Sequence, residues 1–111
     1  MTTATMNWTE RDNRNFRTME CAESVVRKAA ESLGINLGLG LLYHITHRGI
    51  AGVATVAEIL SYSDRKPQVM QDGNWRGLTQ VEAAALQTAA NSCRIDDAAD
   101  RKRFARRMEI S

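Results

Sequence analysis

Two histidines and two cysteines are the side chains of this sequence whose chemistry suits a metal site or a nucleophilic centre. His44 and His47 stand three residues apart, so on a helix they would point in roughly the same direction. Zinc modules combine such ligands with closely spaced cysteine pairs, and neither Cys21 nor Cys93 belongs to a CxxC pair. We therefore expect no metal ion and no other cofactor. One histidine should pack in the core, and the other should lie near the C-terminal end of a helix, where the dipole favours a cation.

The sequence contains none of the short motifs that mark common catalytic sites. GxSxG, HExxH and the phosphate-binding GxxxxGK[ST] loop are all missing. Gly34, Gly38 and Gly40 resemble a phosphate cradle in their spacing, but no predicted strand precedes them. We interpret Gly34 as the end of a helix and expect a neighbouring backbone to come close to Gly38 and Gly40. The protein is therefore expected not to be an enzyme.

Positive charge is concentrated on one arc of a helix predicted near the end of the chain. The four cations of this arc are Lys102, Arg103, Arg106 and Arg107. Such a face could contact the phosphates of DNA or RNA. The same helix opens with aspartates and closes with arginines, as the helix dipole favours, and Asp97 stands four residues before Arg101, the spacing of a stabilising ion pair. We favour solvated helix charges, and a nucleic-acid contact is the alternative.

A helix-turn-helix ending in this helix would present aspartates to the DNA, which argues against that motif.

A second group of residues has the composition of a protein-binding surface. Tyr62, Arg65, Trp75 and Arg76 lie in and beside a predicted loop and hairpin. Aromatic residues and arginine dominate the energetics of protein interfaces, so we interpret these four as candidate partner-binding residues. The alternative for Trp75 is that it anchors the hairpin to the core.

Composition places the chain among single-domain globular proteins. It has 111 residues, 43% of them hydrophobic and only 5% aromatic, with a net charge of +2. So small an excess of positive charge does not by itself call for nucleic acid. The two cysteines form no secreted-type framework, the first residues lack a signal-peptide pattern, and no apolar run approaches the ~20 residues that span a bilayer. We expect a cytoplasmic protein with reduced thiols and no membrane contact.

Apolar residues recur at three- and four-residue spacing over most of the chain, which predicts a mainly α-helical fold. The clearest pattern covers residues 8–33, with Asn7 as N-cap and Glu10 completing a capping box. Its buried face is expected to include Phe16, Met19, Val26 and Leu33. Residues 1–7 are interpreted as a flexible leader, and residues 8–111 as one helical domain.

Four further helices and one hairpin complete the expected bundle of about five helices. The helices are expected at residues 35–49 (N-cap Asn36, ending at Gly49), 51–60, 79–90 (capping box Thr79 and Glu82) and 95–108. The expected apolar face of the helix at residues 79–90 consists of Val81, Ala84, Ala85 and Ala89. A short β-hairpin is predicted near residues 68–76, with Asp72-Gly73 in a type I′ turn and Met70 opposite Trp75.

These observations lead to a functional expectation. A small helical protein without catalytic motifs suits a regulatory or inhibitory role, exerted by binding a larger macromolecule as adaptors, immunity proteins and mobile-element inhibitors do. A protein partner is expected, and a DNA- or RNA-binding regulator is the alternative. Because two-fold pairs are the commonest oligomers, we expect a homodimer rather than a monomer.

Overall fold

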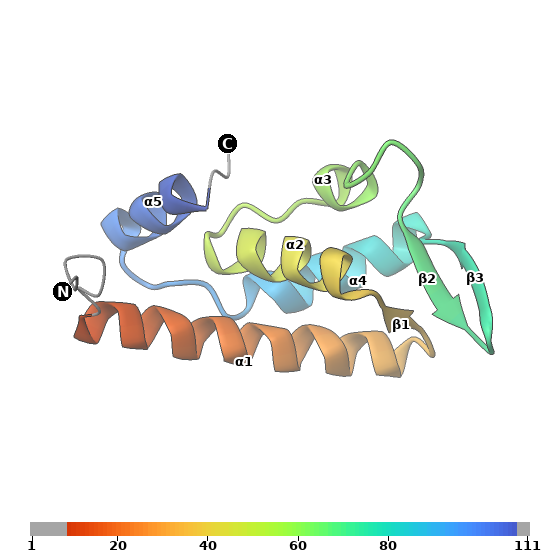
Figure 1. Cartoon of the computed structure of the whole chain (residues 1–111), viewed down its shortest axis with the longest axis horizontal. Coiled ribbons are helices and arrows are strands. Elements are labelled where there is room, and N and C mark those ends of the chain that lie inside the picture. Colours follow the sequence, from red (N-terminus) through yellow and green to blue (C-terminus); the bar gives the residue numbers. More distant parts are fainter. Residues whose placement is uncertain (1–8, 109–111) are drawn as a thin grey trace, which may run out of the picture.

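The computed structural model describes residues 9–108, so the leader expected at residues 1–7 lies outside the described part of the chain. As expected, the protein is mainly α-helical with a short hairpin. Its elements are α1 (Glu10–Ser32), β1 (Asn36–Leu37), α2 (Leu39–Ile50), α3 (Val56–Leu60), β2 (Gln68–Gln71), β3 (Asn74–Gly77), α4 (Gln80–Asn91) and α5 (Ala98–Arg107) (Figure 1). The sheet lies at one end of the molecule, and α5 and the first turns of α1 lie at the other.

α1 is one continuous helix, as the sequence predicts, but its start and its buried face differ. Thr9 rather than Asn7 caps it: the Thr9 hydroxyl accepts from the Asp12 backbone N–H, and the Asp12 carboxylate accepts from that of Thr9. Val26 is fully buried, whereas Phe16 is 45% exposed, so the predicted burial of Phe16 is wrong. The first half of α1 extends beyond the main core, and within residues 9–108 Phe16 belongs to neither buried apolar cluster.

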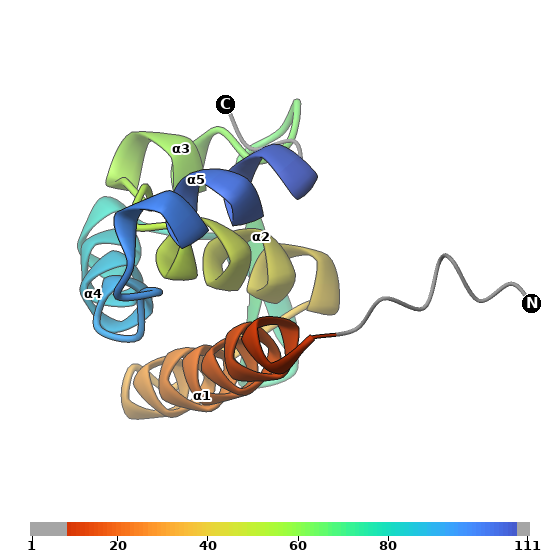
Figure 2. The same cartoon turned by 90° about the vertical axis from the view of Figure 1, so that its left-hand side faces the viewer.

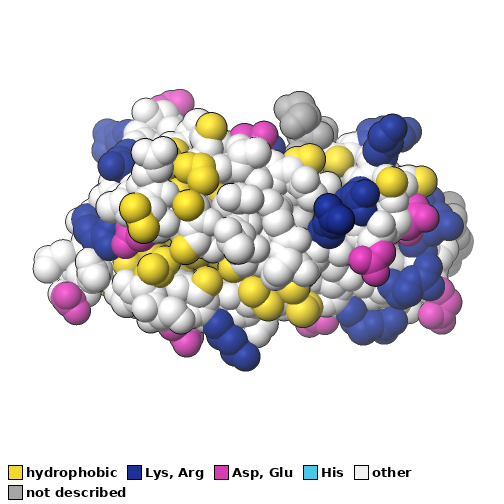
Figure 3. Space-filling view, turned by 180° about the vertical axis from the view of Figure 1, so that it is seen from behind, with side chains coloured by type: hydrophobic (Ala, Val, Ile, Leu, Met, Phe, Trp, Pro, Cys, Tyr) yellow, Lys and Arg dark blue, Asp and Glu magenta, His cyan; other side chains and the backbone are white. Residues whose placement is uncertain are grey.

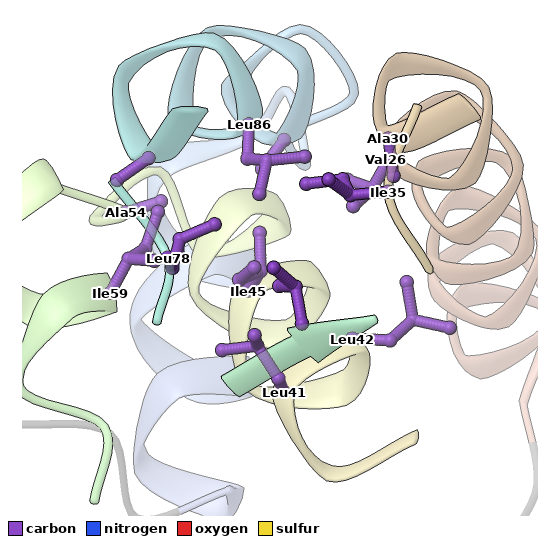
Figure 4. Packing of buried hydrophobic residues seen from close by; sticks show 13 residues of the cluster. Val26, Ala30, Ile35, Leu41, Leu42, Ile45, Ala54, Ile59, Leu78 and Leu86 are labelled. Carbon is purple, nitrogen blue, oxygen red and sulfur yellow. The ribbon is translucent and has the colours of Figure 1, made fainter. Parts of the chain in front are cut away.

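The main core lies between α1, α2 and α4 (Figure 4). Its largest fully buried side chains include Ile35, Leu42, Ile45, Ile59, Leu78 and Leu86. The predicted apolar face of α4 is wrong, because Val81 is 77% exposed and Ala84 is also exposed. The buried face of α4 is formed by Glu82, Ala83, Leu86 and Ala90. Leu86 is the largest apolar side chain of that helix, and its burial decides the face.

Residues 36–37 form a strand that the sequence analysis missed, so the expected N-cap at Asn36 is wrong. β1 pairs antiparallel with β2, with Asn36 opposite Met70 and Leu37 opposite Val69. α2 therefore begins after Gly38, its N-cap. Two residues are too few for an alternating pattern, and their partner strand lies more than 30 residues further along the chain.

The turn and the register of the hairpin are those predicted from the sequence. Asp72 and Gly73 have φ angles of 52° and 81°, as a type I′ turn requires, and Met70 lies opposite Trp75. The strand order β1-β2-β3 leaves β3 at the edge of the sheet.

The helices predicted at residues 51–60 and 95–108 are shorter in the structure, because a polar side chain caps each helix later than expected. Thr55 caps α3 by accepting from the Glu58 backbone N–H, and Asp97 caps α5 by accepting from that of Asp100. α5 buries none of its residues. A second, small apolar cluster supports it, formed by Ala22, Ile50 and Ile95 with Met19, Cys93 and Phe104 packed against them. No helix within residues 9–108 is long and apolar enough to cross a membrane.

Candidate functional site

Two neighbouring hollows lie between α1 and α5. Figure 2 shows these two helices from the end of the molecule at which α5 lies. The larger hollow, here called the basic cleft, has a volume of 720 Å³. It is lined by Arg11, Arg14, Asn15 and Thr18 of α1, by residues 94–97, and by Ala99, Asp100, Arg103 and Arg106 of α5. Seen from behind, lysine and arginine side chains are densest over this end of the molecule (Figure 3). The sequence analysis missed Arg11, Arg14 and Arg94, because Arg11 and Arg14 lie far from α5 in the sequence and Arg94 lies outside the helix, in the segment that leads into it.

Ion pairs across the gap hold α5 against α1. The Asp100 carboxylate lies 3.2 Å from Arg11 Nε and 2.8 Å from Arg103 Nη2, and Arg107 Nη1 lies 3.3 Å from Asp12. A backbone hydrogen bond from Thr9 is the main cause that lowers the pKa of Asp12, and Arg107 adds to it. Because the arginines are about half exposed or more, each pair stabilises the docking of α5 only weakly.

The smaller hollow, here called the apolar groove, has a volume of 200 Å³. Phe16, Met19, Phe104 and Met108 form its apolar lining, and Asp12, Asn15, Arg103 and Arg107 form its rim. Phe16 is 45% exposed and Met108 is 39% exposed. Aromatic, methionine and arginine side chains therefore meet here within one hollow.

The four cations predicted on one arc are all exposed, but they do not form one face. Arg103 and Arg106 line the basic cleft, Arg103 and Arg107 border the apolar groove, and Lys102 lines neither. The expected ion pair between Asp97 and Arg101 is wrong. Arg101 Nη1 instead donates to the backbone carbonyls of Ile95 and Asp96, at 2.6 and 2.7 Å, and so fixes the segment that leads into α5.

The four predicted partner-binding residues have different surroundings. Tyr62 packs on α2, with its ring 4.6 Å from that of His44. Arg65 is exposed, and Trp75 is 57% exposed on the edge strand, so Trp75 does not anchor the hairpin in the core. Arg76 points its guanidinium at Glu82, with Nη1 2.9 Å from Oε1. Arg76 thus has a structural role inside this chain.

Both histidines are half-buried. His47 lies in the last turn of α2, as the sequence predicts, whereas the predicted core position of the other histidine is wrong, because His44 is not fully buried. His47 lies between two rings, with centroid distances of 6.1 Å to Tyr43 and 6.1 Å to Phe104. His44 Nε2 lies 3.4 Å from the Glu58 carbonyl oxygen. Burial is the main cause that lowers the pKa of both imidazoles. Through its ring contact with Phe104, His47 connects α2 to α5.

The structure also brings the two cysteines together, with 3.4 Å between Cys21 Sγ and Cys93 Sγ. Sequence spacing gave no signal for this contact, because 72 residues separate the two positions. Within residues 9–108, no three His, Cys, Asp or Glu side chains form a group that could hold a metal ion.

No protein-family model matches this chain, and no curated protein or solved structure resembles it significantly.

Proposed function

We propose that this protein is a small regulatory protein that acts by binding a larger protein, and that the contact is made at the apolar groove between α1 and α5. The observation that carries the proposal is the exposure of Phe16 and Met108 in a hollow that arginines border. Aromatic and arginine side chains around a central apolar pocket are typical of the energetic centre of protein interfaces. The proposal moves the contact away from Tyr62, Arg65, Trp75 and Arg76, because Tyr62 packs on α2 and Arg76 is paired with Glu82 inside the chain.

The groove also indicates the chemistry of its partner. Its floor accepts an apolar side chain, and Arg103 and Arg107 on its rim are 52% and 66% exposed at their side chains. An apolar side chain next to a carboxylate fits both features, because each guanidinium has further N–H donors besides the nitrogen that pairs with Asp100 or Asp12. We therefore expect the partner to present an acidic segment with at least one large apolar residue.

The test compares capture of partner proteins by four tagged full-length chains in a nuclease-treated extract of the source cells. The chains are the wild type, Phe16→Asp, Arg107→Gln and the control Trp75→Ser at the opposite end of the molecule. One defined protein should be retained by the wild type and by Trp75→Ser. Its affinity, measured with the purified partner, should fall about 30-fold or more for Phe16→Asp and less for Arg107→Gln. Thermal melting checks that each variant is folded.

Two results would contradict this assignment. Equal capture by all four chains would remove the groove from the interface, and loss of capture only in Trp75→Ser would return the contact to the edge strand. The homodimer expected from the sequence stays a prediction, and light scattering tests it. A wild-type mass of twice 12.4 kDa that Phe16→Asp halves would make a second copy the occupant of the groove.

Nucleic-acid binding is a second candidate, favoured by the five arginines of the basic cleft. Three aspartates, Asp96, Asp97 and Asp100, line the same cleft. Asp100 already pairs with two of the arginines. Because these carboxylates offset part of the positive charge of the cleft, we place nucleic-acid binding second.

A further inference from the structure

Cys21 and Cys93 form a pair of thiols at the surface of this protein. Cys21 is exposed on α1, and Cys93 is half-buried in the turn that follows α4. Their sulfur atoms are 3.4 Å apart, and a disulfide bond requires about 2 Å. A modest rotation of the two side chains would therefore bring the sulfurs to bonding distance. No other cysteine exists in the chain.

The charged side chains that line the hollow around the two thiols are all positive. Both cysteines line an open hollow of 570 Å³ whose other lining residues are Arg14, Arg17, Thr18, Ser92 and Arg94. Three guanidinium groups and no carboxylate thus border the two sulfurs. A hollow lined by charges of one sign raises the local concentration of ligands of the opposite sign.

The two thiols also act on each other chemically. The neighbouring sulfur of Cys93 raises the pKa of the Cys21 thiol, through a hydrogen bond first and through charge repulsion second. The Cys21 thiol therefore keeps its proton more tightly than an isolated cysteine, and its reaction with a disulfide should become faster as the pH rises and more thiolate forms.

We propose that Cys21 and Cys93 form a redox-active dithiol site that exchanges with small anionic disulfides. One thiolate attacks a sulfur of the incoming disulfide, whose S–S bond breaks and releases one thiolate. The second cysteine then attacks the mixed disulfide, the Cys21–Cys93 bond forms, and the second thiolate leaves. Two electrons and two protons pass from the protein to the small molecule, which departs as two thiols. Arg14, Arg17 and Arg94 attract the anionic oxidant.

A disulfide bond between Cys21 and Cys93 would also make this end of the molecule more rigid. Cys93 packs on the small cluster of Ala22, Ile50 and Ile95, which supports α5. A covalent link from α1 to this turn would fix the segment that carries α5, and it would close a long loop of the chain. The dithiol site stands on these contacts alone and does not depend on the apolar groove having a partner.

The first experiment incubates the folded wild type with oxidised glutathione and follows the intact mass. We expect the loss of two hydrogens without any added glutathione, reversal by a reducing agent, and a Tm that is higher by at least ~5 °C in the oxidised form. Cys21→Ser and Cys93→Ser should instead each stop at a mixed disulfide with one glutathione. Failure of the folded wild type to lose two hydrogens, or disulfides formed only between molecules, would overturn the proposal.

The second experiment tests the arginines. The triple change of Arg14, Arg17 and Arg94 to glutamine should slow oxidation by oxidised glutathione about tenfold at low salt. It should leave the rate with uncharged hydroxyethyl disulfide within about twofold of the wild-type rate. Arg65→Gln, an exposed arginine outside the hollow, is the matched control and should change neither rate. Equal slowing with the charged and uncharged disulfides would refute the recognition of anions.

Discussion

Glu82 shows how one side chain can serve two parts of the fold. Its carboxylate accepts from the Thr79 backbone N–H at 3.0 Å, which completes the capping box predicted for α4. It also accepts from both terminal nitrogens of Arg76, at 2.9 and 2.5 Å. Glu82 is only 8% exposed, so this pair ties the edge strand to the start of α4 in a largely dry environment.

The protonation of Glu82 leads to a prediction about pH. The Arg76 hydrogen bonds are the main cause that lowers the pKa of Glu82 from 4.5 to about 2. Because the folded-state pKa is depressed, the contribution is complete above pH 4.5 and is lost as pH falls towards 2. We expect Glu82→Gln to lower the free energy of unfolding by about 2 kcal/mol at pH 7, after a discount for the partial hydration of Arg76.

Urea denaturation of the wild type and of Glu82→Gln at several pH values measures this difference. The two proteins should converge in stability as the pH falls from 4.5 towards 2. Glu31→Gln, an exposed site on α1, is the control and should match the wild type throughout. A difference that is independent of pH would show that lost packing, rather than the charge, accounts for the effect.

At the scale of elements, the crossing of α2 and α4 depends on Gly49. A Cβ added there would lie 2.6 Å from both the Cβ and the carbonyl oxygen of Ala90. The close approach that the sequence suggested at Gly38 and Gly40 is therefore at Gly49. Gly38 has nothing within 4 Å, and Gly40 faces the side chain of Tyr62.

We predict that Gly49→Ala destabilises the protein by about 1–3 kcal/mol. The added methyl group forces the two helices apart, and the better helix propensity of alanine offsets only part of that cost. Gly38→Ala, at the N-cap of the same helix, is the control in open surroundings and should cost no more than about 0.5–1 kcal/mol, because only the N-cap preference for glycine over alanine is lost. Thermal or urea unfolding measures both variants. Equal stability of the two variants would mean that the α2–α4 crossing relaxes freely.

At the scale of the whole molecule, the two hollows and the dithiol site gather at the end that carries α5. α5 buries no residue, and it depends on exposed ion pairs and on the small apolar cluster. Helices held so weakly open more easily than the core, so α5 is the element that a partner or a disulfide could influence most. The opposite end is a sheet whose edge strand exposes Trp75.

The arginines of α5 provide the test between the two proposed functions. We predict that the wild type forms no salt-sensitive complex with duplex DNA or RNA at physiological salt. Replacing Arg103, Arg106 and Arg107 by glutamine should lower Tm by only a few degrees, because two of the three lose exposed ion pairs. Fluorescence anisotropy over a range of salt concentrations measures the binding. A complex that weakens steeply with salt, and whose salt slope the triple change reduces, would favour the nucleic-acid function.

The sequence by itself determined the features that depend on neighbours within a few residues. The continuity of α1, the capping box of Thr79 and Glu82, and the Asp72-Gly73 turn with its register all arise from local hydrogen bonds and from backbone conformations that particular residues prefer. The helical class followed from periodicity, because the burial of one face is repeated along each helix.

Only the tertiary structure decided which surfaces meet. β1 depends on a partner strand more than 30 residues away, and the thiol pair on a turn 72 residues away. The basic cleft and the apolar groove exist because residues 92–97 carry α5 back to the first turns of α1. Such contacts depend on the path of the whole chain and on which apolar faces pack together. The spacing of residues within one segment does not predict either of these.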